Sequence, residues 1–217
     1  MIPSLIGVIL IILTIKESPP NPNKVFRPIR LNEISANLRL LFVLSAIFTL
    51  ATFSYSFLLI YAQKVGFKIF MIPVLYLGYN LVASFCSIPF GKFSDHYGRK
   101  ILLLIAFLLW GLVCAIIIYR LSMWSVVIAL FFYGMHKGAF ETAQKAFVSE
   151  LSPQIYRASC LGYFQMLMGL CALPASVIAG VLWDKVGTVA PLFFSLSLTL
   201  VAAVLLFFVK EKNIDTV

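Results

Sequence analysis

Charged residues are scarce in this sequence. They make up 12% of its 217 residues, against about 25% in soluble globular proteins. Hydrophobic residues make up 62%, against about 45–50% in such proteins. An ordinary water-soluble domain is therefore excluded, and the composition predicts a polytopic membrane protein whose partner is the lipid bilayer.

Residues that carry enzyme or metal chemistry are also scarce. The only histidines are His96 and His136, which lie too far apart in membrane depth to share a metal. The sequence lacks H-E-x-x-H, G-x-S-x-G and a Gly-rich phosphate loop. Four cysteines without C-x-x-C spacing lie in or beside apolar runs, as small buried hydrophobes do: Cys86, Cys114, Cys160 and Cys171. We expect no enzyme activity, no metal site and no cofactor.

Six apolar runs are long enough to cross a bilayer, whose core of about 30 Å needs roughly 20 helical residues. Backbone groups in lipid must be satisfied internally, so all six are predicted to be helices. A shorter run at residues 1–15 lacks the charged start and cleavage site of a signal peptide, and we interpret it as the end of a truncated span. The six spans cover residues 40–62, 70–90, 101–119, 123–148, 158–182 and 190–209.

Lysine and arginine are distributed unevenly between the two ends of these spans. Eleven fall in loops on one side and four on the other. Cytoplasmic loops collect such residues, so segments 16–39, 91–100 and 149–157 and the C-terminal tail 210–217 are predicted to be cytoplasmic. The net charge of +9 then belongs to the membrane surface and does not indicate a nucleic-acid partner. The Pro-rich segment 16–39 is predicted to be a linker loop.

The span 40–62 carries hydroxyl groups at helical spacing. They recur at steps of four, three and four residues, which places them on one face: Ser45, Thr49, Thr52 and Ser56. Such a face suits a polar cavity. The alternative is that these small residues allow close helix contact and bond to their own carbonyls. In the span 70–90, Tyr79 and Asn80 lie at mid-depth, where an amide needs a partner in a cavity or a neighbouring helix.

The span 123–148 carries His136, Lys137 and Glu141 near its middle. Charges there are costly and need a reason. Lys137 and Glu141 are four residues apart, a spacing that allows an ion pair, while His136 has an ordinary pKa close to neutrality. We expect this cluster to bind solute or carry protons. The alternative is an ion pair that fixes the helix against its neighbours.

The remaining spans differ in polarity. The spans 101–119 and 190–209 have almost no polar side chains and are predicted to be peripheral. The span 158–182 carries small residues at four-residue steps around a proline, which predicts a seam for close helix packing with a kink. The seam consists of Ala172, Pro174, Ser176 and Gly180.

A motif follows the span 70–90: Gly91-Lys-Phe-Ser-Asp95-His-Tyr-Gly98-Arg99-Lys100. We expect the glycines to allow a tight loop, Asp95 to sit at a helix N-terminus, and Arg99 and Lys100 to anchor the cytoplasmic face. The motif resembles the loop signature of the major facilitator superfamily, G-x-L-x-D-x-x-G-R-K, with Phe and His at two positions. The skeleton returns 89 residues later, from Gly180 to Gly187, after three spans. Copies on opposite membrane faces indicate an inverted repeat of three plus three helices.

The resemblance implies an all-α fold: the C-terminal six-helix half of a twelve-helix transporter at residues 40–209, preceded by the end of the sixth helix. It implies alternating-access transport of a small solute across the cell membrane, with protons as the expected coupling ion. The first and fourth spans would line the cavity, and Asp95 and Arg99 would belong to a cytoplasmic gate. Two alternatives stay open: a half that assembles with itself or with a partner half, and a truncated fragment without activity.

Overall fold

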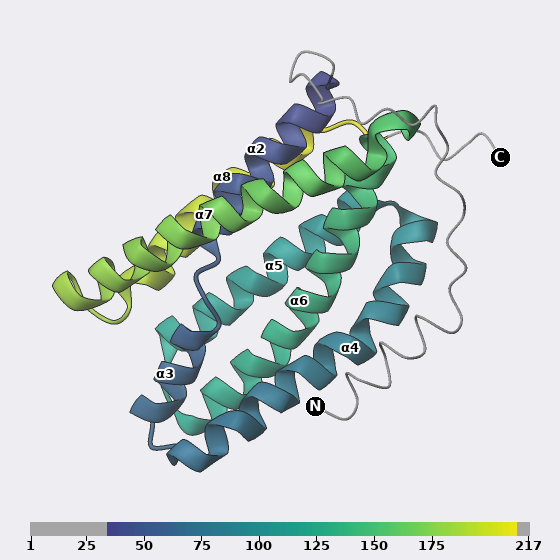
Figure 1. Ribbon diagram of the computed structural model, residues 1–217. Coiled ribbons are helices and arrows are strands. Elements are labelled where there is room, and N and C mark those ends of the chain that lie inside the picture. The colour runs from purple at the N-terminus through teal and green to yellow at the C-terminus, as the bar shows by residue number, and fades with distance from the viewer. Residues whose placement is uncertain (1–33, 212–217) are drawn as a thin grey trace, which may run out of the picture.

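The computed structural model describes residues 34–211 (Figure 1). The expected truncated span at 1–15, most of the linker 16–39 and most of the tail 210–217 lie outside these residues. Residues 34–211 form helices joined by short turns and contain no strand. The helices are α2 (Ala36–Ala51), α3 (Ser56–Lys64), η2 (Ile69–Met71), α4 (Ile72–Tyr97), α5 (Arg99–Tyr119), α6 (Met123–Leu151), η3 (Gln154–Tyr156), α7 (Arg157–Lys185) and α8 (Ala190–Phe208).

Six helical segments of residues 34–211 are long and apolar enough to cross a membrane, and they coincide with the six predicted runs. The predicted all-α membrane fold is confirmed. The first segment begins at Ala36, four residues before the expected start. Ser35 caps it, because its hydroxyl oxygen accepts a hydrogen bond from the Leu38 backbone N–H at 3.3 Å.

The first span is broken, which corrects the expectation of one continuous helix over 40–62. Helix α2 ends at Ala51 and α3 begins at Ser56. The hydroxyl of Ser54 accepts a hydrogen bond from the Ser56 backbone N–H at 3.3 Å. Ser and Thr side chains offer the backbone such local alternatives to helical bonds, and two of them stand within the break. Ser56 therefore does not continue the face of α2 on which the other three hydroxyls were placed.

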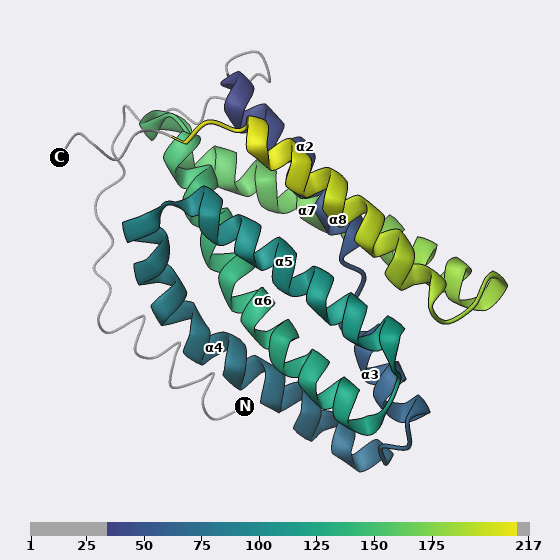
Figure 2. The ribbon, with the colours of Figure 1, turned by 180° about the vertical axis from the view of Figure 1, so that it is seen from behind.

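The two triplets of spans exchange their first helices. Helix α2 packs against α7 and α8 of the second triplet, and α6 packs against α4 and α5 of the first. This reciprocal packing is what an inverted three-plus-three repeat produces. Helices α5 and α8 lie together on the face seen in Figure 2, away from the face that shows α6 and α7 in Figure 1. The hydrophobic stretch of α5 is nevertheless the most buried of the six, at 44%, so the peripheral position of the spans 101–119 and 190–209 stays a prediction.

Helices α4 and α6 cross at very short range. A Cβ atom built on Gly134 would lie 2.6 Å from the carbonyl oxygen of Tyr79, and one on Gly138 would lie 2.7 Å from that of Ala83. Two glycines four residues apart are a known device for close helix approach in membranes. The close-packing seam between described helices is therefore formed by Gly134 and Gly138 on α6. These two glycines were not among the residues predicted from the sequence.

The buried core lies between α5 and its neighbours. The indole N–H of Trp110 on α5 donates to the hydroxyl of Ser195 on α8 at 2.7 Å, and both residues are fully buried. Cys114 and Cys160 are buried as expected, whereas Cys86 and Cys171 are partly exposed. All four cysteines are free thiols.

Candidate functional site

Two polar hollows flank α6. The first, of about 540 Å³, lies between α4 and α6, and we call it the α4–α6 hollow. The second, of about 480 Å³, lies between the break after α2, α6 and α7, and we call it the α2–α7 hollow. Lys137, Glu141 and Lys145 stand on successive turns of α6 and line both hollows. Three charged side chains of a membrane-spanning helix therefore face the same open region.

Lys137 is held by α4. Its Nζ donates a hydrogen bond to Asn80 Oδ1 at 3.2 Å and lies 5.4 Å from the centroid of the Tyr79 ring. The alternative ion pair between Lys137 and Glu141, which their spacing allows, is not formed. Glu141 Oε2 instead lies 3.9 Å from Lys145 Nζ, and both of those side chains are about half exposed. The close crossing at Gly138 explains the difference, because it brings the Asn80 amide within reach of Lys137.

The side chain of His136 lies in the buried core, at the edge of the α2–α7 hollow. It is 4% exposed, and its Nδ1 lies 2.8 Å from the carbonyl oxygen of Ala106 on α5. Aromatic rings surround it, among them Phe140 at 5.5 Å and Trp110 at 5.4 Å between centroids. It also borders the α2–α7 hollow. His136 therefore has the contacts of a buried packing residue, and a role in proton transfer stays a prediction.

The hydroxyl groups predicted to share one face of α2 lie partly in a hollow and partly outside it. Thr49 and Thr52 line the α2–α7 hollow, and their hydroxyls donate to the carbonyls of Ser45 and Phe48 in their own helix at 2.8 and 3.0 Å. Thr49 Oγ1 also lies 3.0 Å from the sulfur of Met168 on α7. Ser45 is fully buried, and Ser56 is exposed at the start of α3, outside both hollows. The structure therefore places only two of the four hydroxyls at the site.

A cluster of tyrosines borders the site, and sequence analysis found only one of its members. Tyr79 is buried among the rings of Tyr55, Tyr76 and Tyr133, at centroid distances of 5.9, 5.2 and 5.1 Å. Tyr55 and Tyr133 also line the α2–α7 hollow. The four rings come from the break after α2, from α4 and from α6, and local spacing connects only Tyr76 and Tyr79, which are three residues apart on α4.

The predicted seam on α7 has no described helix against it. A Cβ on Gly180 would meet no atom within 4 Å. Ser176 donates to the carbonyl of Ala172 in its own helix at 3.2 Å, and Pro174 lies inside the continuous helix α7. The small residues that α7 does bury are Ala175 and Ala179. A packing role of the seam stays a prediction.

The motif is largely helical, which corrects the expected loop. Helix α4 runs to Tyr97 and ends at Gly98, whose φ of +100° is a conformation that favours glycine. Gly91 lies within α4, where a Cβ would make an ordinary contact of 3.8 Å with Thr142. Asp95 therefore lies in the last turn of α4 and not at a helix N-terminus.

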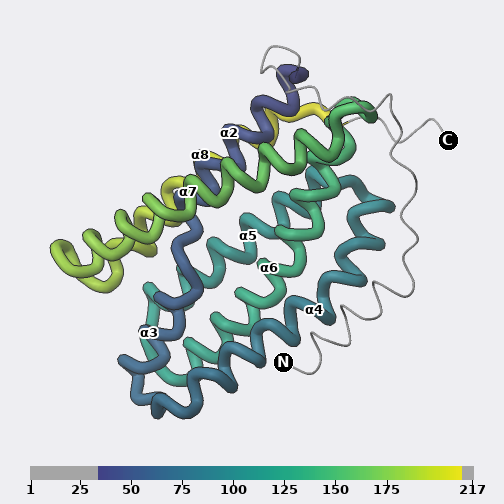
Figure 3. The backbone as a smooth tube through the Cα atoms, viewed as in Figure 1, coloured from purple at the N-terminus to yellow at the C-terminus, as the bar shows by residue number. Residues whose placement is uncertain are grey.

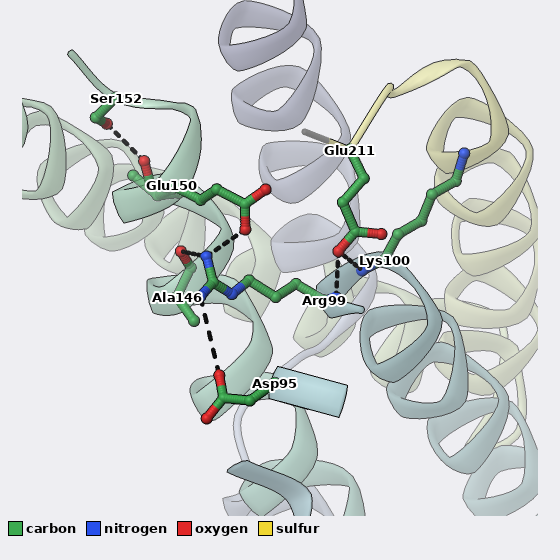
Figure 4. Close-up of polar contacts among 8 residues, drawn as sticks. Asp95, Arg99, Lys100, Ala146, Glu150, Ser152 and Glu211 are labelled. Atoms are coloured by element: carbon green, nitrogen blue, oxygen red, sulfur yellow. Dashed lines mark hydrogen bonds and ion pairs between the residues drawn. The ribbon is translucent and has the colours of Figure 1, made fainter. Parts of the chain in front are cut away.

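Arg99 joins the ends of three helices (Figure 4). Its guanidinium forms an ion pair with Glu150 near the end of α6 and donates to the Ala146 carbonyl at 3.3 Å. Its Nη2 also lies 3.9 Å from Asp95 Oδ1. The side chain of Glu150 is 17% exposed and that of Asp95 is 75% exposed, so Glu150 is the stronger partner.

Glu211 caps the first turn of α5, the position that sequence analysis assigned to Asp95. Its carboxylate accepts hydrogen bonds from the backbone N–H groups of Arg99 and Lys100. A carboxylate there also interacts favourably with the helix dipole. Lys100 in turn caps the end of α8, because its Nζ donates to the carbonyls of Phe207 and Val209 at 2.9 and 2.8 Å. More than 100 residues separate Glu211 from Arg99, and no local pattern indicated this contact.

The second copy of the motif also lies at the end of a helix and has a glycine with positive φ. Gly187 has a φ of +138° and stands one residue beyond Val186, the C-cap of α7, whereas Gly98 is itself the C-cap of α4. The two turns lie at opposite ends of the bundle, as the chain trace in Figure 3 shows. At the second turn, Trp183 packs on Tyr61 with 4.8 Å between centroids, and Lys64 Nζ lies 4.6 Å above its indole.

The fold and this site define a polytopic membrane protein of the transporter class. Six spans form an inverted repeat, and the charged motif stands where the first triplet turns between its second and third spans. The family model described as "Major Facilitator Superfamily" matches residues 40–216. The chain belongs to the Major Facilitator Superfamily.

Three curated relatives are similar to this chain. Two are uncharacterized MFS-type transporters of Methanocaldococcus jannaschii. One is 38% identical over 202 residues, which is 90% of this chain and 50% of that protein. The other is 23% identical over 67% of this chain and 38% of that protein. Facilitated glucose transporter member 12 of solute carrier family 2 from Danio rerio is 27% identical over 90 residues, 42% of this chain and 15% of that protein. The chain thus spans half or less of the length of these relatives.

Proposed function

We propose that this chain is the C-terminal six-helix half of a transporter that moves a small solute across the cell membrane by alternating access. The observation that carries the proposal is the pair of hollows on either side of α6. They are lined by Lys137, Glu141 and Lys145 in the middle and inner part of a membrane span. Ionisable groups inside a span mark solute or ion pathways.

A second six-helix bundle is part of this proposal. In the hydrophobic stretch of each span, 6% of the residues are buried for Ile69–Tyr97 and 11% for Gln154–Lys185, against 44% for Arg99–Tyr119. Helices α4 and α7 thus have broad uncovered faces beside the hollows. The relative that is 38% identical is about twice as long as the matched region, which leaves length for such a bundle. The small-residue seam on α7 would then pack against the second bundle.

We infer that transport is coupled to protons through Glu141. Its carboxylate is about half exposed to the hollows and lies 3.9 Å from Lys145 Nζ. Protonation would remove the negative charge from this pair and release Lys145. Asp95, Arg99 and Glu150 would stabilise the gate at the end of the helices that the lysine and arginine distribution places in the cytoplasm.

Proton-driven uptake into liposomes tests the proposed function. The polypeptide that carries this chain is reconstituted, a pH gradient is imposed, and accumulation of a radiolabelled panel is measured, with glucose included because of the zebrafish relative. We expect one solute to accumulate only with the gradient, and Glu141→Gln to abolish accumulation. Asp184→Asn, at an exposed carboxylate outside the hollows, is the matched control. Gradient-independent accumulation, or full activity of Glu141→Gln, would contradict proton coupling.

A further inference from the structure

The charges around the two hollows do not balance. Lys137 and Lys145 line both hollows together with Glu141, which lies 3.9 Å from Lys145 Nζ. The contacts of Lys137 are neutral: the Asn80 amide oxygen and the Tyr79 ring. Among residues 34–211, no carboxylate lies within 4.0 Å of its amine. One positive charge of a membrane span is therefore left without a counter-charge.

A cation inside a membrane span is costly unless an anion accompanies it. Hydrogen bonds that an ammonium group donates to neutral acceptors position it, but they do not cancel its charge. The amine of Lys145 is paired with the carboxylate of Glu141, and its side chain is 55% exposed. Lys137 is only partly exposed, and its position on α6 is fixed by the backbone contact between Gly138 and Ala83. An anionic ligand would complete the electrostatics of the site at Lys137.

We propose that Lys137 binds the carboxylate of a small organic anion, so that the solute of this transporter is an organic carboxylate. This inference rests on the proposed function, since it assigns the solute class of the same site. The volumes of about 540 and 480 Å³ fall in the range of small-ligand pockets. A charge-assisted hydrogen bond from an amine that is already positioned needs little further ordering.

The surroundings of Lys137 also suit the rest of such a solute. The rings of Tyr55, Tyr133 and Phe140 line the α2–α7 hollow and provide apolar surface. Gln144 and Gln165 line the same hollow and provide amide groups for polar substituents. A carboxylate on an apolar or hydroxylated carbon body therefore matches both the charge and the lining.

The binding experiment compares acids with their own amides. The melting temperature of the purified polypeptide in detergent is measured with acetate, lactate, succinate and benzoate, and with acetamide, lactamide, succinamide and benzamide. Each amide keeps nearly the size of its acid and lacks the charge. We expect at least one carboxylate to raise the melting temperature and its amide to have no effect. Equal shifts from an acid and its amide, or no shift from any carboxylate, would overturn the inference.

Variants then assign the effect to Lys137. Lys137→Gln is expected to weaken binding of the active carboxylate about 10- to 100-fold, whereas Lys137→Arg keeps the cation and retains binding. Lys64→Gln is the matched control, because the Lys64 amine lies on Trp183 outside both hollows. Unchanged binding by Lys137→Gln would overturn the inference.

The same measurements distinguish a carboxylate solute at Lys137 from an ion pair with a second bundle and from a neutral solute. If a carboxylate of a second bundle neutralises Lys137, then Lys137→Gln lowers the melting temperature without ligand and carboxylates give no shift, which overturns the inference. If a neutral sugar is transported and no carboxylate binds, the inference fails while the proposed function stands. If a carboxylate binds through Lys137 but nothing is transported, the proposed function fails.

Discussion

A methyl group at Gly138 would test the crossing that positions Lys137. In Gly138→Ala the new Cβ would lie 2.7 Å from the carbonyl oxygen of Ala83. Ordinary contact begins at 3.4 Å, so the two helices must separate locally by about 0.7 Å. The obstacle is backbone, which cannot rotate away as a side chain can. Overpacking of this kind costs about 1–3 kcal/mol.

Gly78→Ala is the matched control for this substitution. Gly78 is in α4, the other helix of the pair, and a Cβ there would meet no atom within 4 Å. Both substitutions gain about 1 kcal/mol of helix propensity, so this gain cancels in the comparison. We expect Gly138→Ala to have a free energy of unfolding about 1–3 kcal/mol below that of Gly78→Ala. Helix content followed by circular dichroism during SDS titration in mixed micelles provides the measurement.

A result that would refute this reasoning is a pair of variants whose unfolding free energies agree within about 0.5 kcal/mol. Helices α4 and α6 would then be packed less closely than the 2.7 Å between a Cβ on Gly138 and the carbonyl oxygen of Ala83 implies. Binding gives an independent readout, because separation of the helices moves Asn80 away from Lys137. Gly138→Ala should therefore also weaken binding of the carboxylate ligand that raises the melting temperature, and Gly78→Ala should leave this binding unchanged.

The other predictions concern the helix ends and the core. Glu150→Gln should lower the free energy of unfolding by about 1–3 kcal/mol, whereas Asp95→Asn, at a side chain that is 75% exposed, should change it by less than about 0.5 kcal/mol. Glu211→Gln should destabilise by about 0.5–2 kcal/mol through the cap of α5, which faster amide exchange at the start of that helix would reveal. Ser195→Ala should cost about 1–3 kcal/mol, because it leaves the buried indole N–H of Trp110 without its partner; Ser197→Ala, at an exposed hydroxyl, should be neutral.

The six spans were predictable because a bilayer imposes a length and a composition on each of them. Hydropathy cannot show where a span is interrupted, and it missed the break between Ala51 and Ser56. Of the two hydroxyl residues in the break, Thr52 was assigned to one continuous face with Ser45, Thr49 and Ser56, and Ser54 was not identified. Only the backbone positions show that the chain leaves the helix after Ala51.

The partners of the charged residues were less predictable than the residues themselves. Lys137 and Glu141 were identified because charge is rare inside a span, and both line the hollows. Helical spacing allowed them to pair with each other, but Lys137 bonds to Asn80 on α4 instead. The contact depends on the distance between two helices, which the glycines of α6 determine. Glu211 was missed for the same reason, since its contact with α5 depends on how α8 packs.

The motif at the end of α4 combines a structural role with an exposed carboxylate. Arg99 is fixed by Glu150 and by the Ala146 carbonyl, both on α6, so this part of the network holds helices of one bundle together. Asp95 contacts Arg99 at 3.9 Å, yet its side chain is 75% exposed. A group that closes against a second bundle must be accessible and must have its charge held in place by its own bundle. Asp95 meets both conditions and Glu150, at 17% exposed, does not. Loss of transport without loss of stability is therefore expected at Asp95, and loss of both at Glu150.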